Sequence, residues 1–115
     1  MSLGCDSMKV YNKLVRDNII DIILDSHKSL SYRTLDLDEY KYYLKKKLLE
    51  ESNEFDSSMN KDDMIVEMAD VFEVIEAILE VYDINIDEVL DVKKMKEEKR
   101  GKFKERLFLE YVDDE

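Results

Sequence analysis

The spacing of apolar residues predicts four helices, because apolar side chains recur at three- and four-residue intervals in four separate stretches. We expect these helices at about residues 18–26, 39–56, 61–82 and 85–99, with the last one ending near Gly101. The expected N-cap residues, in chain order, are Asp17, Asp38, Asn60 and either Asn85 or Asp87.

The predicted second and third helices are separated only by residues 56–60. A connection this short makes them antiparallel neighbours. We therefore expect an all-α fold, a bundle of four main helices that forms a single domain over residues 8–115. The tail from Phe103 to Val112 is open to two interpretations, a continued helix or a strand that pairs with Val10–Val15.

Two acidic residues of the second predicted helix disturb its apolar pattern. At 100° per residue, Tyr40, Leu44 and Leu48 define an apolar arc of about 80°. Glu51 falls inside this arc, and Glu54 falls about 40° beyond its edge. We therefore expect the Glu51 carboxylate to point where an apolar side chain would be usual.

The third predicted helix repeats this arrangement. On the helical wheel, Val74 lies about 20° to one side of Glu67 and Ile78 about 20° to the other. Asp70 lies about 60° from Glu67, at the edge of the apolar stripe. Each of the two helices thus carries one acid within its apolar face and a second acid three residues along.

An ionised carboxylate withdrawn from water is unfavourable unless it is paired or bound to a metal ion. Acids at positions i and i+3 on two facing helices can converge, and oxygen ligands suit hard divalent cations. The pattern predicts a site for Mg²⁺, with Mn²⁺ as the alternative, built from Glu51, Glu54, Glu67 and Asp70. The competing interpretation is that these spacings arise by chance among 29 acidic residues, and that the side chains are solvated or paired with lysines.

The net charge of the chain limits the kinds of molecule that it can bind. Acidic residues outnumber basic ones 29 to 18, which gives a net charge of −11. A nucleic acid polymer is therefore an unfavourable partner, because no broad basic face offsets its phosphates. A small anionic substrate remains compatible, since divalent cations can bridge it to carboxylates. With 115 residues, a small helical domain often completes its core with a second copy, so we expect a homodimer or homotetramer.

Cysteine and histidine are too few for a disulfide or a zinc cluster, since the chain has one of each, Cys5 and His27. No stretch approaches the roughly 20 apolar residues that span a bilayer. We expect a cytoplasmic protein without a membrane partner. Residues 1–7 are unlike the remainder of the chain and are interpreted as a leader of partly non-native origin or without order, with Met8 as the natural start.

Two acidic motifs, together with matching segments around them in a fixed order, give the chain a family resemblance. Glu51-Ser52-Asn53-Glu54 is followed, after residues 55–66, by Glu67-Met68-Ala69-Asp70. The chain thereby resembles the MazG-like all-α nucleoside triphosphate pyrophosphohydrolases, and in particular a small stand-alone subgroup related to phosphoribosyl-ATP pyrophosphatase. The resemblance covers residues 9–109 and includes four further segments, Tyr11–Asp17, Lys47–Glu51, Ala69–Val74 and Arg100–Phe103. It departs from the family pattern at Asn18-Ile19-Ile20, where relatives carry Lys-Ile-Pro.

The resemblance implies Mg²⁺-dependent hydrolysis between the α and β phosphates of a nucleoside triphosphate, which gives the monophosphate and pyrophosphate. It also implies a house-cleaning role against noncanonical nucleotides. The four acids of the two motifs would hold the metal, and Glu50 or Glu54 would accept the proton of the attacking water. The phosphates would be bound by basic residues within the matched segments: Lys13, Arg16, Lys47, Arg100 and Lys102.

Other candidate residues carry weaker signals. Tyr11, Phe72 or Phe103 could stack on a base, although aromatic residues at helical spacing more often belong to the core. His27 has no flanking motif for nucleophilic catalysis, so we expect it to cap a helix or lie at the surface. The alternative to an enzyme is a non-enzymatic helical module that binds a partner, or that binds nucleotide without cleaving it.

Overall fold

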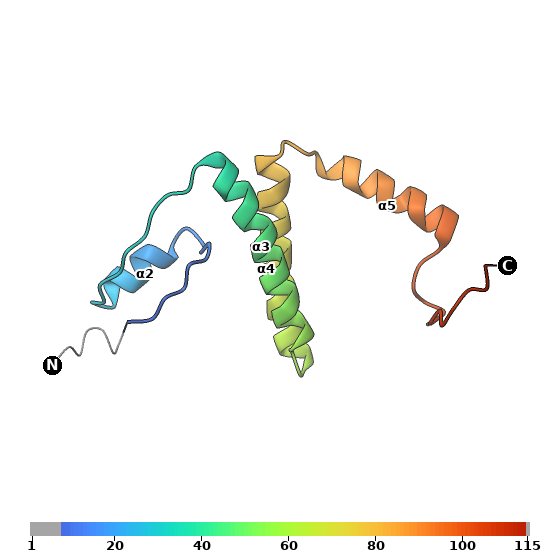
Figure 1. The fold of residues 1–115 in the computed structure, drawn as a ribbon, viewed down its shortest axis with the longest axis horizontal. Helices are drawn as coiled ribbons and strands as arrows, with labels where there is room; N and C mark the ends of the chain where they lie inside the picture. Colours follow the sequence, from blue (N-terminus) through green and yellow to red (C-terminus); the bar gives the residue numbers. More distant parts are fainter. Residues whose placement is uncertain (1–7, 115) are drawn as a thin grey trace. The chain divides into compact units, whose positions relative to one another are not determined.

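The computed structural model describes residues 8–114, and helices are the regular elements within that range (Figure 1). They are α2 (Ile19–Asp25), α3 (Leu37–Asp56), α4 (Lys61–Val81) and α5 (Ile86–Arg100). No strand occurs between residues 8 and 114. The all-α prediction is confirmed. The leader predicted for residues 1–7, with Cys5, lies outside the described residues.

The tail from Phe103 to Val112 forms neither of the elements predicted for it, because it contains only a short turn near residue 104. Phe103, Leu107 and Phe108 are 85–99% exposed. A segment whose large apolar side chains are not packed gains no burial energy that would offset the entropy of ordering it. Both the helical and the strand interpretation of this tail are therefore wrong.

The chain divides after Val81 into two compact units, the first with α2, α3 and α4 and the second with α5. In the first unit, α3 and α4 run antiparallel and pack side by side, joined by residues 57–60 (Figure 1). Leu44 on α3 and Val74 on α4 are the buried apolar side chains of the described chain, 2% and 8% exposed. Both belong to the predicted apolar faces. No helix in the described range is both long and apolar enough to cross a membrane.

Helix α3 begins two residues before its predicted start. Asp36 is the N-cap, and its side chain accepts a hydrogen bond of 2.9 Å from the backbone N–H of Glu39, whereas Asp38 lies within the first turn. The prediction that Asp38 is the cap is therefore wrong. The Arg33 guanidinium also contacts this turn, because it donates two hydrogen bonds, of 3.0 and 2.7 Å, to the Glu39 carboxylate.

The remaining helix ends are set by local hydrogen bonds. The Asn60 side chain accepts from the N–H of Asp63 at 2.9 Å, as predicted for the start of α4. Asn85, rather than Asp87, caps α5 and forms a capping box with Glu88. The Asp17 cap predicted for α2 is wrong, because Asn18 is the N-cap residue and makes no side-chain cap bond. A backbone turn begins α2 instead, in which the N–H of Ile19 donates to the carbonyl of Arg16 at 3.1 Å.

His27 follows Ser26, the C-cap residue of α2, and lies at the surface, which was one of the two predicted roles. Its φ is 61°, in the left-handed region, and its N–H donates to the carbonyl of Leu24 at 3.0 Å. This hydrogen bond satisfies a carbonyl at the helix terminus. The imidazole is exposed at the surface of the molecule.

Substitution of Asp36 tests which acid begins α3. We expect Asp36→Ala to lower the free energy of unfolding by about 1 kcal/mol, because it removes the side-chain acceptor at the N-cap. Asp38→Ala, which removes the same charge from the first turn, should cost less than half as much. Chemical denaturation of both variants followed by circular dichroism measures the difference. An equal or larger loss for Asp38→Ala would contradict the assignment.

Candidate metal centre

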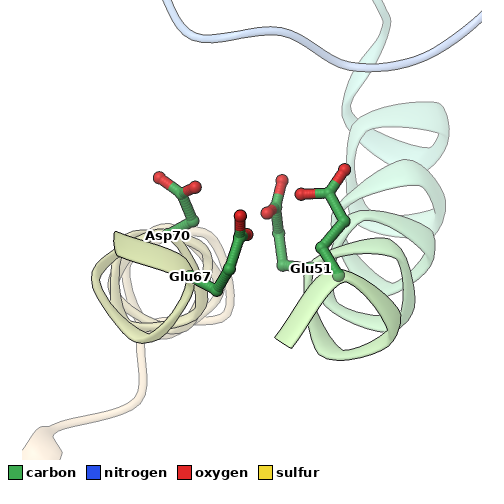
Figure 2. Close-up of side chains that lie close together, drawn as sticks. Glu51, Glu67 and Asp70 are labelled. Atoms are coloured by element: carbon green, nitrogen blue, oxygen red, sulfur yellow. The ribbon is translucent and has the colours of Figure 1, made fainter. Parts of the chain in front are cut away.

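Four carboxylates converge between α3 and α4. Glu51 and Glu54 project from α3, and Glu67 and Asp70 project from α4, each pair at the i, i+3 spacing that places both side chains on one helix face. One oxygen of each carboxylate lies within 4.8 Å of an oxygen of each of the others. Figure 2 shows Glu51, Glu67 and Asp70 projecting from the same side of the helix pair. The convergence expected from the helical pattern is thus present.

Burial and hydrogen bonding distinguish this cluster from ordinary surface acids. Glu51 is only 6% exposed, although its neighbours along α3 are largely solvated. Its Oε2 atom and the Oε2 atom of Glu67 are buried and accept no hydrogen bond. A buried acceptor without a partner costs free energy, and the cost is greater for a charged group. The oxygens present therefore fit a hard divalent cation, which prefers carboxylate oxygen and would remove this deficit.

The same environment changes the acidity of Glu51. Burial raises the pKa of Glu51 above its ordinary value, and Glu54 and Asp70 raise it further because they carry like charges close by. Lys47, whose Nζ lies 3.5 Å from Glu51 Oε1, acts in the opposite direction. The ionised form of Glu51 is therefore unfavourable without a cation, chiefly because the side chain is buried and also because like charges lie close by.

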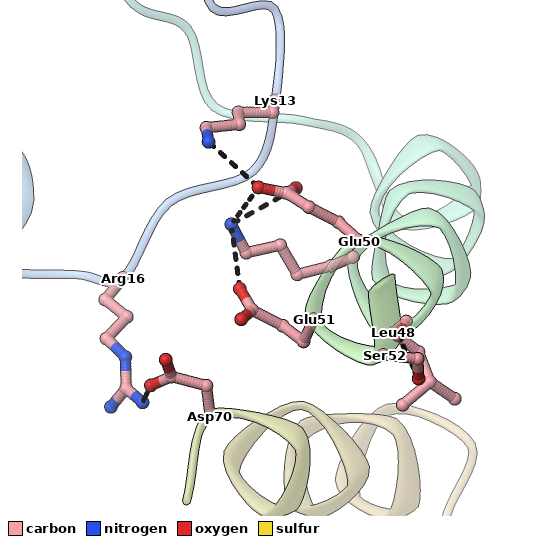
Figure 3. A network of polar contacts seen from close by, with 8 residues as sticks. Lys13, Arg16, Leu48, Glu50, Glu51, Ser52 and Asp70 are labelled. Carbon is pink, nitrogen blue, oxygen red and sulfur yellow. Dashed lines mark hydrogen bonds and ion pairs between the residues drawn. The ribbon is translucent and has the colours of Figure 1, made fainter. Parts of the chain in front are cut away.

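Basic side chains face the cluster from one side (Figure 3). Lys13, in the segment that precedes α2, donates to Glu50 Oε1 at 2.8 Å, and Lys47 lies 3.4 Å from Glu50 Oε2. Glu50 raises the pKa of Lys13 by accepting this hydrogen bond. Burial acts to raise the pKa of Glu50, but the hydrogen bonds and charges of the two lysines outweigh it, and the pKa is lowered.

Arg16 links the same N-terminal segment to α4 (Figure 3). Its Nη2 donates to Asp70 Oδ1 at 2.8 Å, and its Nη1 lies 3.7 Å from Glu73 Oε1. The sequence pattern marked Arg16 and Asp70 as separate candidates but missed their pairing and the part of Glu73. Arg16 and Asp70 are 54 residues apart, and no local spacing rule connects residues that distant.

Two hollows flank the acids. One, of about 490 Å³, is lined by polar and acidic side chains that include Asn53, Glu54, Asp63 and Glu67. The other, of about 360 Å³, is lined by the three cations Lys13, Arg16 and Lys47 together with Glu51 and Asp70, and by Tyr11, Val15, Ile19 and Ile23. The cluster of four acids therefore lies between an acidic hollow and a basic, partly apolar one.

The other candidate residues lie in different parts of the structure. Tyr11 lines the basic hollow, and its ring centroid lies 5.8 Å from Lys13 Nζ. Phe72 is 61% exposed on α4 and lines neither hollow. Arg100, Lys102 and Phe103 belong to the second unit, so their predicted roles at the substrate remain predictions.

Comparison of the chain with protein-family models, with curated proteins and with solved structures gave no significant match. The interpretation of the cluster therefore depends on its geometry and on the motif residues. The resemblance to MazG-like pyrophosphohydrolases remains an expectation that those motif residues support.

Neutralising the buried acid tests whether its ionised form is unfavourable. We expect Glu51→Gln to raise the thermal midpoint of the metal-free protein by a few degrees, because it removes a buried charge surrounded by like charges. Glu76→Gln changes net charge equally at an exposed position of α4 and should leave the midpoint nearly unchanged. Thermal unfolding in the presence of a chelator measures both. Destabilisation by Glu51→Gln would show that this carboxylate is favourably paired without a cation.

Proposed function

We propose that the chain is a Mg²⁺-dependent nucleoside triphosphate pyrophosphohydrolase of the cytoplasm that cleaves between the α and β phosphates. The observation that carries this proposal is the set of four converging carboxylates with two buried, unpartnered oxygens. The basic hollow beside them supports it, since a triphosphate needs fixed cations in addition to a metal ion.

Each residue has a distinct part in the proposed reaction. Glu51, Glu54, Glu67 and Asp70 hold the metal, which when bound neutralises phosphate charge and orients a water molecule. The oxygen of the attacking water forms a bond to the α phosphorus, and the bond from that phosphorus to the bridging oxygen breaks. Pyrophosphate leaves with the electron pair, and a carboxylate accepts the proton of the water.

The environment of the two candidate bases favours Glu54 as the proton acceptor. Glu50 is held by Lys13 and Lys47, and its pKa is lowered, so it is a weak base whose oxygens are already engaged. Glu54 is exposed and lines the acidic hollow, where water can reach it. This assignment leaves Glu50 to position the two lysines.

Measurement of pyrophosphate release tests the proposal. We expect release from a panel of canonical and altered nucleoside triphosphates only when Mg²⁺ is present, and a loss of about 100-fold or more for Glu67→Gln, because disturbance even of groups that only orient ligands costs 10- to 100-fold. Glu76→Gln should retain the full rate, since it removes the same charge from an exposed part of α4.

Two alternative functions make different predictions in the same experiment. An interaction module without a metal site would release no pyrophosphate and would not be stabilised by Mg²⁺. A nucleotide-binding regulator would be stabilised by Mg²⁺ with nucleotide but would leave the triphosphate intact. Equal release by the wild type and Glu67→Gln would contradict the proposed site.

Exposed apolar side chains support a homo-oligomer. On α4, Ile65, Met68 and Phe72 recur at positions i, i+3 and i+7 on one helix face and are 47–61% exposed. Monomeric proteins rarely leave contiguous apolar surface uncovered, and a second copy would bury it. This face lies on the helix that carries Glu67 and Asp70, so association would also stiffen the metal site.

Light scattering coupled to size-exclusion chromatography measures the assembly. We expect a mass of two or four times the 13.7 kDa of the chain, and a shift toward the monomer for Phe72→Glu. Met59→Glu, at an apolar side chain that is 89% exposed in the connection between α3 and α4, should not change the mass. A wild-type mass of one chain would contradict the expectation.

A further inference from the structure

The three cations of the basic hollow are all paired with acids at or beside the metal cluster. Lys13 donates to Glu50 at 2.8 Å, and Arg16 donates to Asp70 at 2.8 Å. Lys47 lies 3.4 Å from Glu50 and 3.5 Å from Glu51. Without a metal ion, these side chains serve as internal counter-ions of the carboxylates and are not available to an anion.

The cations lie on one side only. The basic hollow has Lys13, Arg16 and Lys47 in its lining, whereas the described residues around the acidic hollow include no lysine or arginine. An anion would therefore be repelled on the acidic side and would be attracted on the basic side, provided that Arg16 and Lys47 were released from Asp70 and Glu51.

A divalent ion bound by the cluster would release Arg16 from Asp70 and Lys47 from Glu51. It would neutralise Glu51 and Asp70, which now hold Lys47 and Arg16, and it would repel a guanidinium or ammonium group held a few ångströms away. Arg16 can move away from Asp70, because its side chain is 55% exposed and the segment that carries it, residues 8–18, has no regular secondary structure. Its planar fork of donors matches two phosphate oxygens at once.

We propose that the basic hollow is a metal-gated site for pyrophosphate or a polyphosphate chain. Metal binding at the four acids displaces Arg16 from Asp70 and Lys47 from Glu51, whereas both lysines keep their contacts with Glu50. Arg16 then binds the anion together with the two lysines. The metal consequently binds first. This inference rests on the metal site of the proposed function, but it does not require that any triphosphate be cleaved.

Calorimetry on the full chain tests the gate with two probes, Mg²⁺ alone and inorganic pyrophosphate. Wild-type protein should bind pyrophosphate only after Mg²⁺ is added. Arg16→Gln should bind Mg²⁺ alone about 3- to 10-fold more tightly, because a competing cation is gone, and should bind pyrophosphate with Mg²⁺ about 10-fold more weakly, because a charge-assisted donor pair is lost. Lys13→Gln should shift both affinities in the same directions, to a smaller extent.

A matched control separates this effect from a general change of charge. Arg33 forms a similar exposed ion pair with Glu39, at 2.7 Å, away from both hollows, so Arg33→Gln should alter neither affinity. Arg16→Lys, which keeps the positive charge, should restore the weaker Mg²⁺ affinity of the wild type and regain part of the pyrophosphate affinity.

Several outcomes would overturn the inference. Weaker Mg²⁺ binding by Arg16→Gln would show that Arg16 positions Asp70 for the metal and does not compete with it. Equal pyrophosphate binding with and without Mg²⁺ would show that no gate exists, and a wild type that binds no Mg²⁺ would remove the site itself. Metal-gated binding of pyrophosphate without turnover of any triphosphate would support this inference and contradict the proposed enzymatic function.

Discussion

Four carboxylates converge between α3 and α4 and repel one another. The basic side chains around them are arranged to compensate this repulsion. The nearest oxygens of the carboxylates lie within 4.8 Å of one another, and the most buried of the four residues, Glu51, is 6% exposed. A helix pair would normally fill this space with apolar side chains, because their burial stabilises the pair. Acids at these positions do not provide that stabilisation, and burial together with the neighbouring acids raises the pKa of Glu51. This combination is typical of sites where function constrains the residue.

The helix pair provides the rigidity that such a cluster needs. The connection of residues 57–60 fixes α3 and α4 as antiparallel neighbours, and the buried contact side chains Leu44 and Val74 hold them together. The N-caps Asp36 and Asn60 define where each helix begins. Because the acids are three residues apart on both helices, this register brings all four carboxylates into one space.

The N-terminal segment contributes in a different way. Lys13 and Arg16 come from chain without regular secondary structure, and they reach Glu50 on α3 and Asp70 on α4. These positive charges compensate the acids from outside the helix pair. The centre thus combines acids on two packed helices with cations from a segment without regular secondary structure.

The sequence by itself determined the helices and the choice of acids. Apolar spacing located α3, α4 and α5 to within two residues, and the position of Glu51 and Glu67 within apolar faces identified them without knowledge of any contact. These features are local, because a helix repeats every 3.6 residues and its faces can be read from spacing alone. The caps were less certain where two acids lie near one helix start, as Asp36 and Asp38 do, because only the structure shows that Asp36 accepts the N–H of Glu39. Only the tertiary structure decided that Arg16 pairs with Asp70 and that Lys13 pairs with Glu50. It also decided that two unlike hollows flank the acids and that the tail after Gly101 remains irregular. Those outcomes depend on contacts between residues far apart in the chain, or on the lack of packing around a segment, and no periodicity in the sequence encodes either.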